Sequence, residues 1–339
     1  MSKSGLAERA PPNLKIRPGA VIRVVKLGDK GWRISQMPEV ESAFVAIDPR
    51  NGAIRALVGG FDFQTSKFNH VTQAWRQPGS SFKPFIYSAA LEKGVTPMTV
   101  VNDAPLFYSA GETGGKPWEP KNYDGQFDGP MSVRRALAKS KNMVSIRVLQ
   151  LVGTQSAQEW VTRFGFDADK HPPYLTMALG AGTVTPMQMA MGYAVFANGG
   201  YRVAPELITK VAESRGKVLY EAPAATLDES RRAIDERNAF LMSSLLQEIT
   251  RSGTAARAQA VLKRSDLYGK TGTTNDSMDA WFVGYQPTVA AAAWVGYDTP
   301  RNLGSRETGG GLSLPIWIDY MAEALKGVAV NDYTPPAGV

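Results

Sequence analysis

Two parts of the chain, one near its start and one near its end, carry the hydrophobic patterns of β-strands. Residues 43–60 (AFVAIDPRNGAIRALVGG) form two β-rich runs around a turn that contains Asn51-Gly52, which is a strong hairpin signal. Near the other end, strand-like runs occupy residues 267–273, 280–285 and 288–297. Only Gln286-Pro287 separates the last two runs, so they predict a second hairpin.

Between these two parts the hydrophobic positions follow a helical period. Residues 80–94 repeat apolar residues three and four positions apart until Gly94 ends the pattern, which predicts a helix. The same spacing predicts further helices at residues 132–139, 143–152, 155–163, 186–197, 236–251 and 314–325. Two short strands are expected near residues 202–222, within this mainly helical region.

The order of the elements is therefore hairpin, helix, helical region, strands and final helix. We expect strands from both ends of the chain to join one antiparallel sheet, with the helical block inserted between them, which is an α+β fold. Residues 13–36 also alternate apolar and polar residues, but in runs too short to build a core of their own.

The composition excludes several kinds of chemistry. The chain has 339 residues, of which 43 % are hydrophobic, and it contains no cysteine. Thiol nucleophiles, zinc–thiolate sites and disulfides are thereby excluded. The sequence has no run of 18 or more apolar residues, so it predicts no transmembrane helix. The formal net charge is +7, but because Lys and Arg form no block, no nucleic acid partner is expected.

The chain contains two histidines, His70 and His171. This count excludes a zinc site built on several histidines, and no metal or cofactor is predicted. We expect both histidines at the surface or in loops rather than in catalysis. A nucleophilic serine would then need a base other than histidine.

Three short motifs occur in order along the chain: S-x-x-K at Ser80–Lys83, S-x-N at Ser140–Asn142 and K-T-G-T at Lys270–Thr273. The first is weak evidence alone, because S-x-x-K occurs again at Ser214–Lys217. That copy precedes a strand-like run and lacks a helix start, so we assign it to a turn. The specificity comes from the ordered set, since the three motifs fall at a helix start, in an inter-helix loop and on a strand.

Ser80 and Lys83 fit the roles of nucleophile and base. They are three residues apart on one face of the predicted helix, so the amine can reach the hydroxyl. Lysine accepts a proton only when it is neutral, and burial or the neighbouring cation of Lys270 would lower its pKa. The helix start offers the backbone N–H of Ser80 to an oxyanion, and Thr273 would supply a second donor. Without the other two motifs, the simpler interpretation would be that Ser80 caps the helix and that Lys83 points into solvent.

The second motif suits proton transfer and amide recognition. Ser140 is expected to relay a proton to the leaving nitrogen, and Asn142 to offer a donor and an acceptor to a substrate amide. Helix capping is an alternative role for both side chains. Lys141, between them, is expected to point into solvent.

The third motif suits the carboxylate at the end of an extended peptide bound along a sheet edge. Its residues are Lys270, Thr271, Gly272 and Thr273. Trp118 and Tyr123, in a polar and loop-like segment, are candidates for lining the substrate cleft, with core packing as the alternative. Packing is expected for the strand aromatics Phe282 and Tyr285.

Five longer segments carry a resemblance to a known family: RQPGSSFKPF, WEPKNYDGQFDGP, LAKSKNMVSIR, ALGAGTVTPMQMAMGYAVFANGG and GKTGTTNDSMDAWFVGYQP. Together with the three motifs, they resemble the transpeptidase domain of class A, bifunctional penicillin-binding proteins over residues 41–326. The resemblance implies a five-stranded antiparallel sheet flanked by helices, as in serine β-lactamases. It also implies an oxyanion hole formed by the backbone N–H groups of Ser80 and Thr273.

The resemblance implies a reaction as well. Ser80 would be acylated by the D-Ala-D-Ala end of a peptidoglycan stem peptide, and the acyl group would pass to an amine of a neighbouring stem. D,D-Carboxypeptidase would be a side activity, and β-lactam antibiotics would acylate the same serine. The setting would be the periplasmic face of the bacterial inner membrane, and no cofactor is implied.

We expect four segments along the chain. Residues 1–12 would be a disordered linker or a remnant of cloning, 13–40 a short β-rich remnant of an accessory module, 41–328 the transpeptidase domain and 329–339 an exposed tail. The family pattern also includes a membrane anchor and a glycosyltransferase domain, and neither is visible in this sequence. We therefore expect a membrane-anchored parent protein, whereas this chain by itself would be soluble.

Two other functions stay open. A serine β-lactamase shares the three motifs but needs a base that activates water, a glutamate after the second motif in class A enzymes. Glu159 and Glu206 do not lie in a segment that resembles that loop. A β-lactam sensor that is acylated without turnover would be joined to a signalling segment, and none is visible.

Overall fold

The computed structural model describes residues 16, 19–113, 116–222, 227–304 and 307–339. The chain divides into two compact units, Met1–Glu39 and Val40–Val339. In the described part of the first unit, β1 (Arg23–Lys26) pairs in an antiparallel sense with β2 (Trp32–Ser35), and the 3-10 turn η3 (Gly28–Lys30) lies between them. All four residues of β1 are exposed. The strand pair thus agrees with the short strands expected there and buries little surface.

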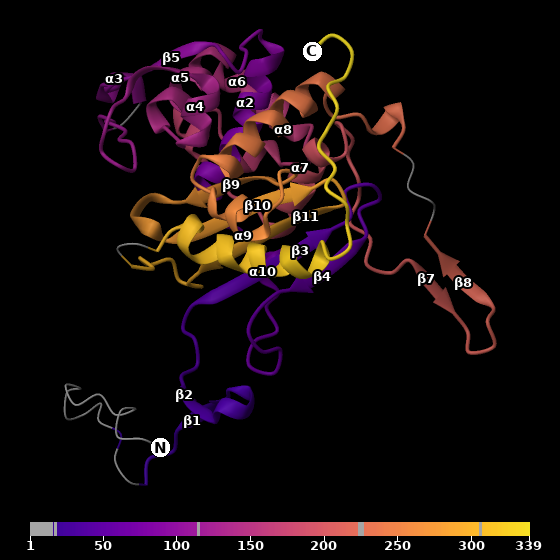
Figure 1. Cartoon of the computed structure of the whole chain (residues 1–339). Helices are drawn as coiled ribbons and strands as arrows, with labels where there is room; N and C mark the ends of the chain where they lie inside the picture. The colour runs from indigo at the N-terminus through magenta and orange to yellow at the C-terminus, as the bar shows by residue number, and fades with distance from the viewer. Residues whose placement is uncertain (1–15, 17–18, 114–115, 223–226, 305–306) are drawn as a thin grey trace. The chain divides into compact units, whose positions relative to one another are not determined.

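A five-stranded antiparallel sheet forms the centre of the second unit (Figure 1). In sheet order its strands are β4 (Ile54–Val58), β3 (Glu41–Ile47), β11 (Val289–Gly296), β10 (Asp279–Gln286) and β9 (Tyr268–Thr273). Strand β3, from the start of the unit, pairs with β11 from its end, so that Ala43 lies opposite Trp294. The predicted α+β fold, with one antiparallel sheet built from both ends of the chain, is therefore confirmed.

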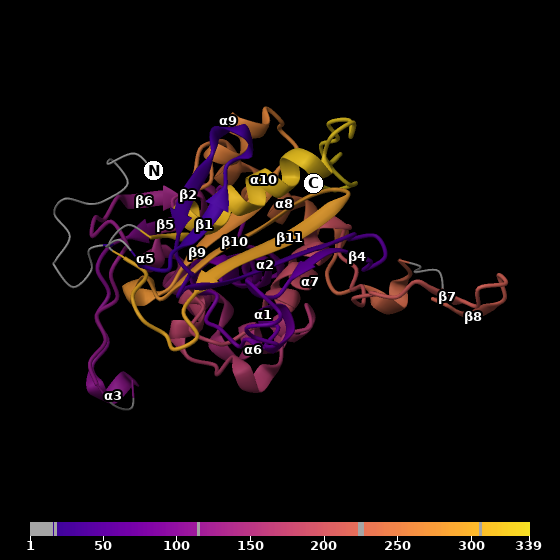
Figure 2. The same cartoon turned by 90° about the horizontal axis from the view of Figure 1, so that it is seen from below.

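Helices cover both faces of this sheet. The α-helices are α1 (His70–Gln73), α2 (Lys83–Glu92), α3 (Ala110–Thr113), α4 (Val133–Ala138), α5 (Asn142–Val152), α6 (Thr154–Thr162), α7 (Pro186–Ala197), α8 (Glu236–Arg251), α9 (Arg257–Leu262) and α10 (Leu314–Ala324). Helices α7 and α8 lie on one face of the sheet and α10 on the other (Figures 1 and 2). Each predicted helix is present: α7 and α8 have the predicted ends, and the ends of the others are shifted by one to three residues. The short helices α1, α3 and α9 were not predicted.

Tighter or wider helical turns connect several of these elements. They are η4 (Gly79–Phe82), η5 (Ala168–Lys170), η6 (Leu175–Leu179), η7 (Glu229–Arg231), η8 (Asn275–Ser277) and the π-turn η9 (Gly309–Ser313). Among the residues that the structure describes, no helix combines the length and the apolar character needed to cross a bilayer.

Large aromatic side chains fill the space around the sheet. Trp281, Trp294 and Trp317 are fully buried. The ring of Phe282 meets that of Trp317 at a centroid distance of 5.0 Å, and the hydroxyl of Tyr285 is hydrogen-bonded within the core. The strand aromatics Phe282 and Tyr285 thus pack in the interior, as expected.

Two small strand pairs lie outside the central sheet. Strand β5 (Val100–Asp103) pairs with β6 (Gly129–Ser132), and this pair was not predicted. Strand β7 (Lys210–Ala212) pairs with β8 (Val218–Glu221), where two short strands were expected. Every residue of β7 and β8 is exposed, so only the first pair contributes to the body of the domain.

Both histidines are buried, so neither lies at the surface, although His171 lies in a loop, as the prediction also allowed, whereas His70 begins α1. The ring nitrogens of His70 lie 2.7 Å from the carbonyl oxygen of Gly59 and 2.7 Å from a carboxylate oxygen of Asp298. His171 stacks on Phe82 with ring centroids 4.6 Å apart. Hydrogen-bonding oxygens around His70, and the aromatic face of Phe82 beside His171, reduce the free-energy cost of burying these imidazole rings.

The C-terminal tail is mostly exposed, as expected, but side-chain hydrogen bonds anchor it. The carboxylate of Asp332 accepts hydrogen bonds from Gln247 at 2.9 Å and from Ser265 at 2.7 Å. The hydroxyl of Tyr333 donates to the carbonyl oxygen of Ala197 at 2.7 Å. The tail is thus held against the body of the domain at these two residues.

Candidate active site

Ser80 lies in the 3-10 turn Gly79–Phe82, and Lys83 is the first residue of α2. The helix predicted from residue 80 therefore begins with a tighter turn, and the backbone N–H of Lys83 bonds the carbonyl oxygen of Ser80. In such a turn, side chains three residues apart project on the same side. The local geometry thus directs Ser80 and Lys83 toward one region.

Lys83 is fully buried, and the second motif surrounds its amine. Nζ donates to the carbonyl oxygen of Ser140 at 2.7 Å, to Oγ of Ser140 at 3.2 Å and to Oδ1 of Asn142 at 2.7 Å. Burial lowers the pKa of Lys83 well below its usual range, and the cation of Lys270 lowers this pKa further, while Asp103 acts in the opposite direction. The neutral amine, which can accept a proton, is thereby favoured.

Ser140 connects the two motif lysines. Its Oγ lies 2.8 Å from Nζ of Lys270 and 3.2 Å from Nζ of Lys83. Ser140 has a φ of +59°, a left-handed conformation that costs a residue other than glycine about 1 kcal/mol or more. Burial lowers the pKa of Lys270 to about 7. One hydroxyl thus bridges two amines that bind protons weakly, which is the geometry of a proton relay.

The side chain of Asn142 faces two partners within the protein. Its Oδ1 accepts from Lys83, and its Nδ2 donates to the carbonyl oxygen of Lys121 at 2.7 Å. An amide side chain can make about four hydrogen bonds. One N–H and one lone pair therefore remain for a substrate amide.

Threonine hydroxyls continue the site along the edge strand β9. Oγ1 of Thr271 lies 2.7 Å from Oγ1 of Thr254, and Oγ1 of Thr273 accepts from the backbone N–H of Gly309 at 3.2 Å. The backbone N–H of Thr254 also donates to the carbonyl oxygen of Ala138 at the end of α4. Thr254 therefore links the strand of the third motif to the helix before the second. Sequence reasoning missed it, because no spacing rule connects it to either motif.

A cavity of about 830 Å³ brings most of the predicted residues together. Its lining includes Ser80, Ser140, Asn142, Thr271 and Thr273. Trp118 and Tyr123 line it as well. Trp118 is half-buried and stacks on Tyr108 with ring centroids 5.4 Å apart, whereas Tyr123 is 71 % exposed. Lys83 and Lys270 do not line the cavity, because both are fully buried.

Gly272, predicted to bind substrate, does not line this cavity but lets the turn that carries Ser80 touch the strand. A Cβ on Gly272 would lie 2.4 Å from the carbonyl oxygen of Pro78. On the other side of the contact, Gly79 has a φ of +54°, and a Cβ there would lie 2.6 Å from the carbonyl oxygen of Thr273. Glycine at these two positions allows the turn that carries the serine to lie directly on β9.

Lys141 is buried, so the prediction that it points into solvent is wrong. The residue is 2 % exposed, and its Nζ lies 3.0 Å from a carboxylate oxygen of Asp124 and 3.4 Å from those of Asp103 and Asp128. A buried amine requires such partners. No group of His, Asp and Glu among the described residues has the arrangement of a metal site.

Asn122 is a second residue that sequence reasoning missed. Its Oδ1 accepts from the backbone N–H of Asn142 at 2.7 Å and from that of Met143 at 3.4 Å. Lys141, the N-cap residue of α5, has no side-chain acceptor for these groups. Asn122 supplies the cap from another segment, which fixes the start of the helix that carries Asn142.

Curated relatives share the whole of this chain but extend well beyond it. Penicillin-binding protein 1A of Neisseria flavescens is 48 % identical over 341 residues, which cover 99 % of this chain and 42 % of the relative. Penicillin-binding protein 1A of Pseudomonas aeruginosa is 44 % identical over 367 residues, which cover 95 % of this chain and 44 % of the relative. The chain thus spans less than half the length of these proteins.

Solved structures and a family model agree with these relatives. The 2.6 Å crystal structure of penicillin-binding protein 1A from Haemophilus influenzae has a TM-score of 0.87 at 37 % identity, covering 93 % of this chain and 52 % of that one. PonA1 from Mycobacterium tuberculosis, in complex with penicillin V, has a TM-score of 0.76 at 28 % identity, covering 90 % and 83 %. The model of the penicillin binding protein transpeptidase domain matches residues 42–322, which contain all three motifs. The chain therefore belongs to the penicillin-binding protein transpeptidase family, and its likeness to penicillin-binding protein 1A assigns it to class A.

Proposed function

We propose that this domain is a serine D,D-transpeptidase that cross-links peptidoglycan stem peptides through an acyl-enzyme on Ser80. β-Lactam antibiotics would acylate the same serine. The proposal rests above all on one observation. The buried amines of Lys83 and Lys270 both lie within hydrogen-bond distance of Oγ of Ser140, and Ser140 lines the same cavity as Ser80.

In the acylation step, Ser80 attacks the carbonyl carbon of the penultimate D-Ala. Neutral Lys83 accepts the hydroxyl proton of Ser80 while the bond between Oγ and carbon forms, because burial favours the neutral amine. The negative charge that develops on the carbonyl oxygen is stabilised by the backbone N–H groups of Ser80 and Thr273.

The tetrahedral intermediate then collapses, which breaks the peptide C–N bond and leaves an ester on Ser80. The leaving nitrogen of the terminal D-Ala takes a proton from Oγ of Ser140, and Lys83 restores the proton of Ser140 over the 3.2 Å that separates the two groups. An amine of a neighbouring stem peptide next gives a proton to the same relay and attacks the ester. A new amide forms, and Ser80 regains its hydroxyl proton. Water in place of that amine gives D,D-carboxypeptidase as a side activity.

Substrate recognition uses the remaining residues of the cavity. The terminal carboxylate fits the hydroxyls of Thr271 and Thr273 along the edge strand, and the cation of Lys270, buried behind this lining, attracts the carboxylate through its charge. Asn142 holds a peptide amide with its remaining donor and acceptor. Two aromatic residues belong to the outer lining: Trp118 and Tyr123.

We also propose the setting of the reaction. The parent protein would be anchored in the bacterial inner membrane with a glycosyltransferase domain, and this domain would act on D-Ala-D-Ala stem peptides at the periplasmic side. The chain covers only 42 % of the Neisseria flavescens relative, which leaves room for such a domain. The complex of PonA1 with penicillin V supports β-lactam recognition here.

Intact-mass spectrometry after incubation with excess benzylpenicillin tests the nucleophile. The unmodified chain should gain one stable adduct, and Ser80→Ala should gain none. Ser81→Ala is the matched control, because Ser81 is buried and its hydroxyl donates to the carbonyl oxygen of Pro78 at 2.7 Å. The control should therefore keep the adduct.

Each other outcome has a definite meaning. An unmodified chain without adduct would overturn the assignment of Ser80. Rapid return to the original mass while penicillin is consumed would indicate a β-lactamase instead. Cross-linking of a D-Ala-D-Ala peptide to an acceptor amine then separates a transpeptidase from a sensor, which would be acylated without turnover.

A further inference from the structure

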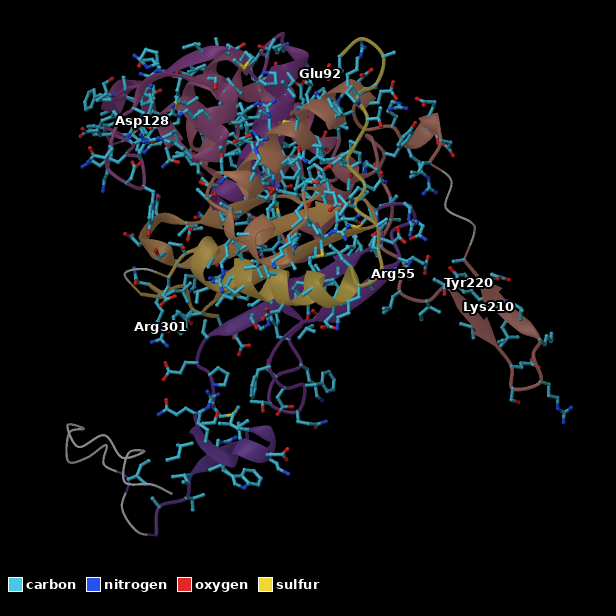
Figure 3. The ribbon with its side chains drawn as sticks, viewed as in Figure 1. Arg55, Glu92, Asp128, Lys210, Tyr220 and Arg301 are labelled. Carbon is cyan, nitrogen blue, oxygen red and sulfur yellow. The ribbon has the colours of Figure 1, made fainter. Side chains whose placement is uncertain are left out.

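A buried pair of opposite charges lies behind the second motif. Nζ of Lys141 is 3.4 Å from Oδ2 of Asp103, and the two side chains are 2 % and 0 % exposed. Asp124 at 3.0 Å and Asp128 at 3.4 Å complete the surroundings of the amine; Asp128 is labelled in Figure 3. Burial of a charged side chain costs free energy. A turn between two helices can form without a buried ion pair, so the pair needs another explanation.

Asp103 is connected to the second motif through one intermediate residue. Its carboxylate accepts hydrogen bonds from Nδ2 of Asn122 at 2.8 and 3.1 Å and from the backbone N–H of Asp128 at 2.9 Å. Asn122 in turn accepts from the backbone N–H of Asn142 at 2.7 Å. Any movement of Asp103 is thereby transmitted to the residue that holds Lys83.

Lys141 is connected to the same motif through the chain itself. It lies between Ser140, whose backbone is left-handed with φ at +59°, and Asn142, which begins α5. Its amine also donates to the carbonyl oxygen of Gln126 at 3.1 Å. The buried lysine thus fastens a strained turn to the segment that contains Asn122.

We propose that Asp103 and Lys141 are positioning residues of the transpeptidase reaction, which hold the turn Ser140–Asn142 and together set the proton affinity of Lys83. The inference rests on the proposed role of Lys83 as the base. Among the described residues, neither side chain is hydrogen-bonded to Ser80 or Lys83: Asp103 reaches Asn142 through Asn122, and Lys141 is the chain neighbour of Ser140 and Asn142.

The charges around this group explain how the pair works. The cation of Lys270 lowers the pKa of Lys83, and the carboxylate of Asp103 raises it. Asp103 acts in the same way on the pKa of Tyr87. The further charged groups are Asp124 and Asp128, whose carboxylates lie beside Nζ of Lys141, and Lys139, which pairs with Asp128. An uncompensated carboxylate at Asp103 would hold a proton on Lys83 and remove the neutral base. Lys141, whose Nζ lies 3.4 Å from Oδ2 of Asp103, offsets part of that charge, so the carboxylate can anchor Asn122 while Lys83 still loses its proton readily.

The inference predicts that variants of Asp103 and Lys141 shift the midpoint of the pH profile of acylation in opposite directions. The rate of acylation by a fluorescent penicillin is measured against pH for the unmodified domain, Lys141→Met, Asp103→Asn and the double variant. Acylation rises with pH as the amine loses its proton, and the midpoint belongs to the coupled lysines. Lys141→Met should move it upward by about one pH unit and Asp103→Asn downward by a similar amount. The double variant should return close to the original midpoint.

Controls separate charge from damage to the fold. Lys93→Met removes an exposed lysine after the end of α2 that belongs neither to this charged group nor to the cavity lining, and it should leave the midpoint in place. Lys141→Arg keeps the charge and should also keep the midpoint. A thermal unfolding curve shows whether each variant is folded. Titration with the fluorescent penicillin gives the fraction of molecules that can be acylated, and rates are compared for that fraction only.

The possible results point in different directions. Shifts of the same sign in both single variants, or no shift, would overturn the inference, because a merely structural role changes amplitude and not the direction of the midpoint. Failure of the unmodified domain to be acylated at all would instead contradict the proposed function.

Discussion

Nζ of Lys83 donates a 2.7 Å hydrogen bond to Oδ1 of Asn142, although 59 residues separate them in the chain. The bond joins the first motif to the second inside the protein, with no substrate required. Because the amine is fully buried and held in place by Ser140 and Asn142, little reorganisation of Lys83 is needed when a proton is transferred.

Replacement of this amine should remove most of the acylation activity. Lys83→Met eliminates the proposed base, and general base catalysis typically contributes about 10²–10⁴-fold. Stopped-flow measurement of penicillin acylation should show a loss of that size, with the fold retained by circular dichroism. Lys93→Met, an exposed lysine after the end of the same helix, is the control. A loss below about tenfold would contradict the role of Lys83 as the base.

Thr254 should matter for substrate affinity. Its hydroxyl lies 2.7 Å from that of Thr271, so Thr254→Val leaves this threonine, which we propose binds the substrate carboxylate, with only the long 3.5 Å hydrogen bond from Nζ of Lys270. We expect about a tenfold loss in the acylation efficiency with a D-Ala-D-Ala peptide, from the contribution of one or two hydrogen bonds. Thr254→Ser keeps the hydroxyl and should recover most of the efficiency. Equal losses in both variants would assign Thr254 to packing alone.

A side chain at Gly272 should separate the turn that carries Ser80 from β9. In Gly272→Ala the new Cβ would lie 2.4 Å from the carbonyl oxygen of Pro78, which forces a backbone shift. The free energy of unfolding should fall by about 1–3 kcal/mol, as for other overpacked sites, and acylation should slow as well. Urea unfolding measures the first effect. Gly111→Ala is the control, since its nearest neighbour would be 3.9 Å away, and unchanged stability in Gly272→Ala would refute the contact.

His171 should make the fold sensitive to acid. Burial lowers the pKa of His171 from 6.5 to about 4, although Asp167 and Asp169 act in the opposite direction. Neither ring nitrogen has a hydrogen-bond partner among the described residues. Between pH 6.5 and 4 the unfolded chain binds a proton that the folded chain excludes, so stability falls as the pH falls.

The size of this effect follows from the shift in pKa. The full loss is about 3 kcal/mol in the free energy of unfolding once the pH is below 4, at 1.36 kcal/mol per pH unit. Chemical unfolding at a series of pH values measures it, and His171→Leu should flatten the curve in that range. Identical curves for both proteins would show that the ring is protonated without cost.

Elements with a local pattern could be predicted closely. Helix α7 was placed at residues 186–197, and the structure begins and ends it there. Its start also has a complete capping box, in which Thr185 and Gln188 bond each other's backbone. Hydrophobic spacing and end signals of this kind lie within one segment, so the sequence alone contains them.

Contacts between distant segments could not be predicted in this way. Strand β5 pairs with β6 through Val100 opposite Ser132, and the β-branched residues Thr99–Val101 form a run too short to predict a strand. Lys141 looks like a surface lysine because its partner Asp103 lies on that unpredicted strand. Burial in both cases is decided by tertiary pairing, which local patterns do not record.

The motif residues of the site were easier to find than their supports. Ser80, Ser140 and Lys270 follow residue-type spacings that the chemistry itself requires. Asn122 and Thr254 support them through backbone groups, of Asn142 and Ala138 respectively. A backbone N–H or carbonyl group is present whatever the residue type, so no sequence pattern indicates these hydrogen bonds.

The pairing of β3 with β11 sets the order of events during synthesis of the chain. Ala43 on β3 can pair with Trp294 on β11 only after residue 294 has been synthesised. Pairings between segments so distant in the chain form slowly. The turn that contains Gly79 is bonded by Gly180 and Tyr193, but it lacks its contact with the strand until Thr273 has emerged from the ribosome. A nascent chain that stops before residue 268 would contain Ser80, Lys83 and Ser140, yet it would lack the strand against which they are aligned. The proposed acylation by penicillin would therefore be acquired late in translation.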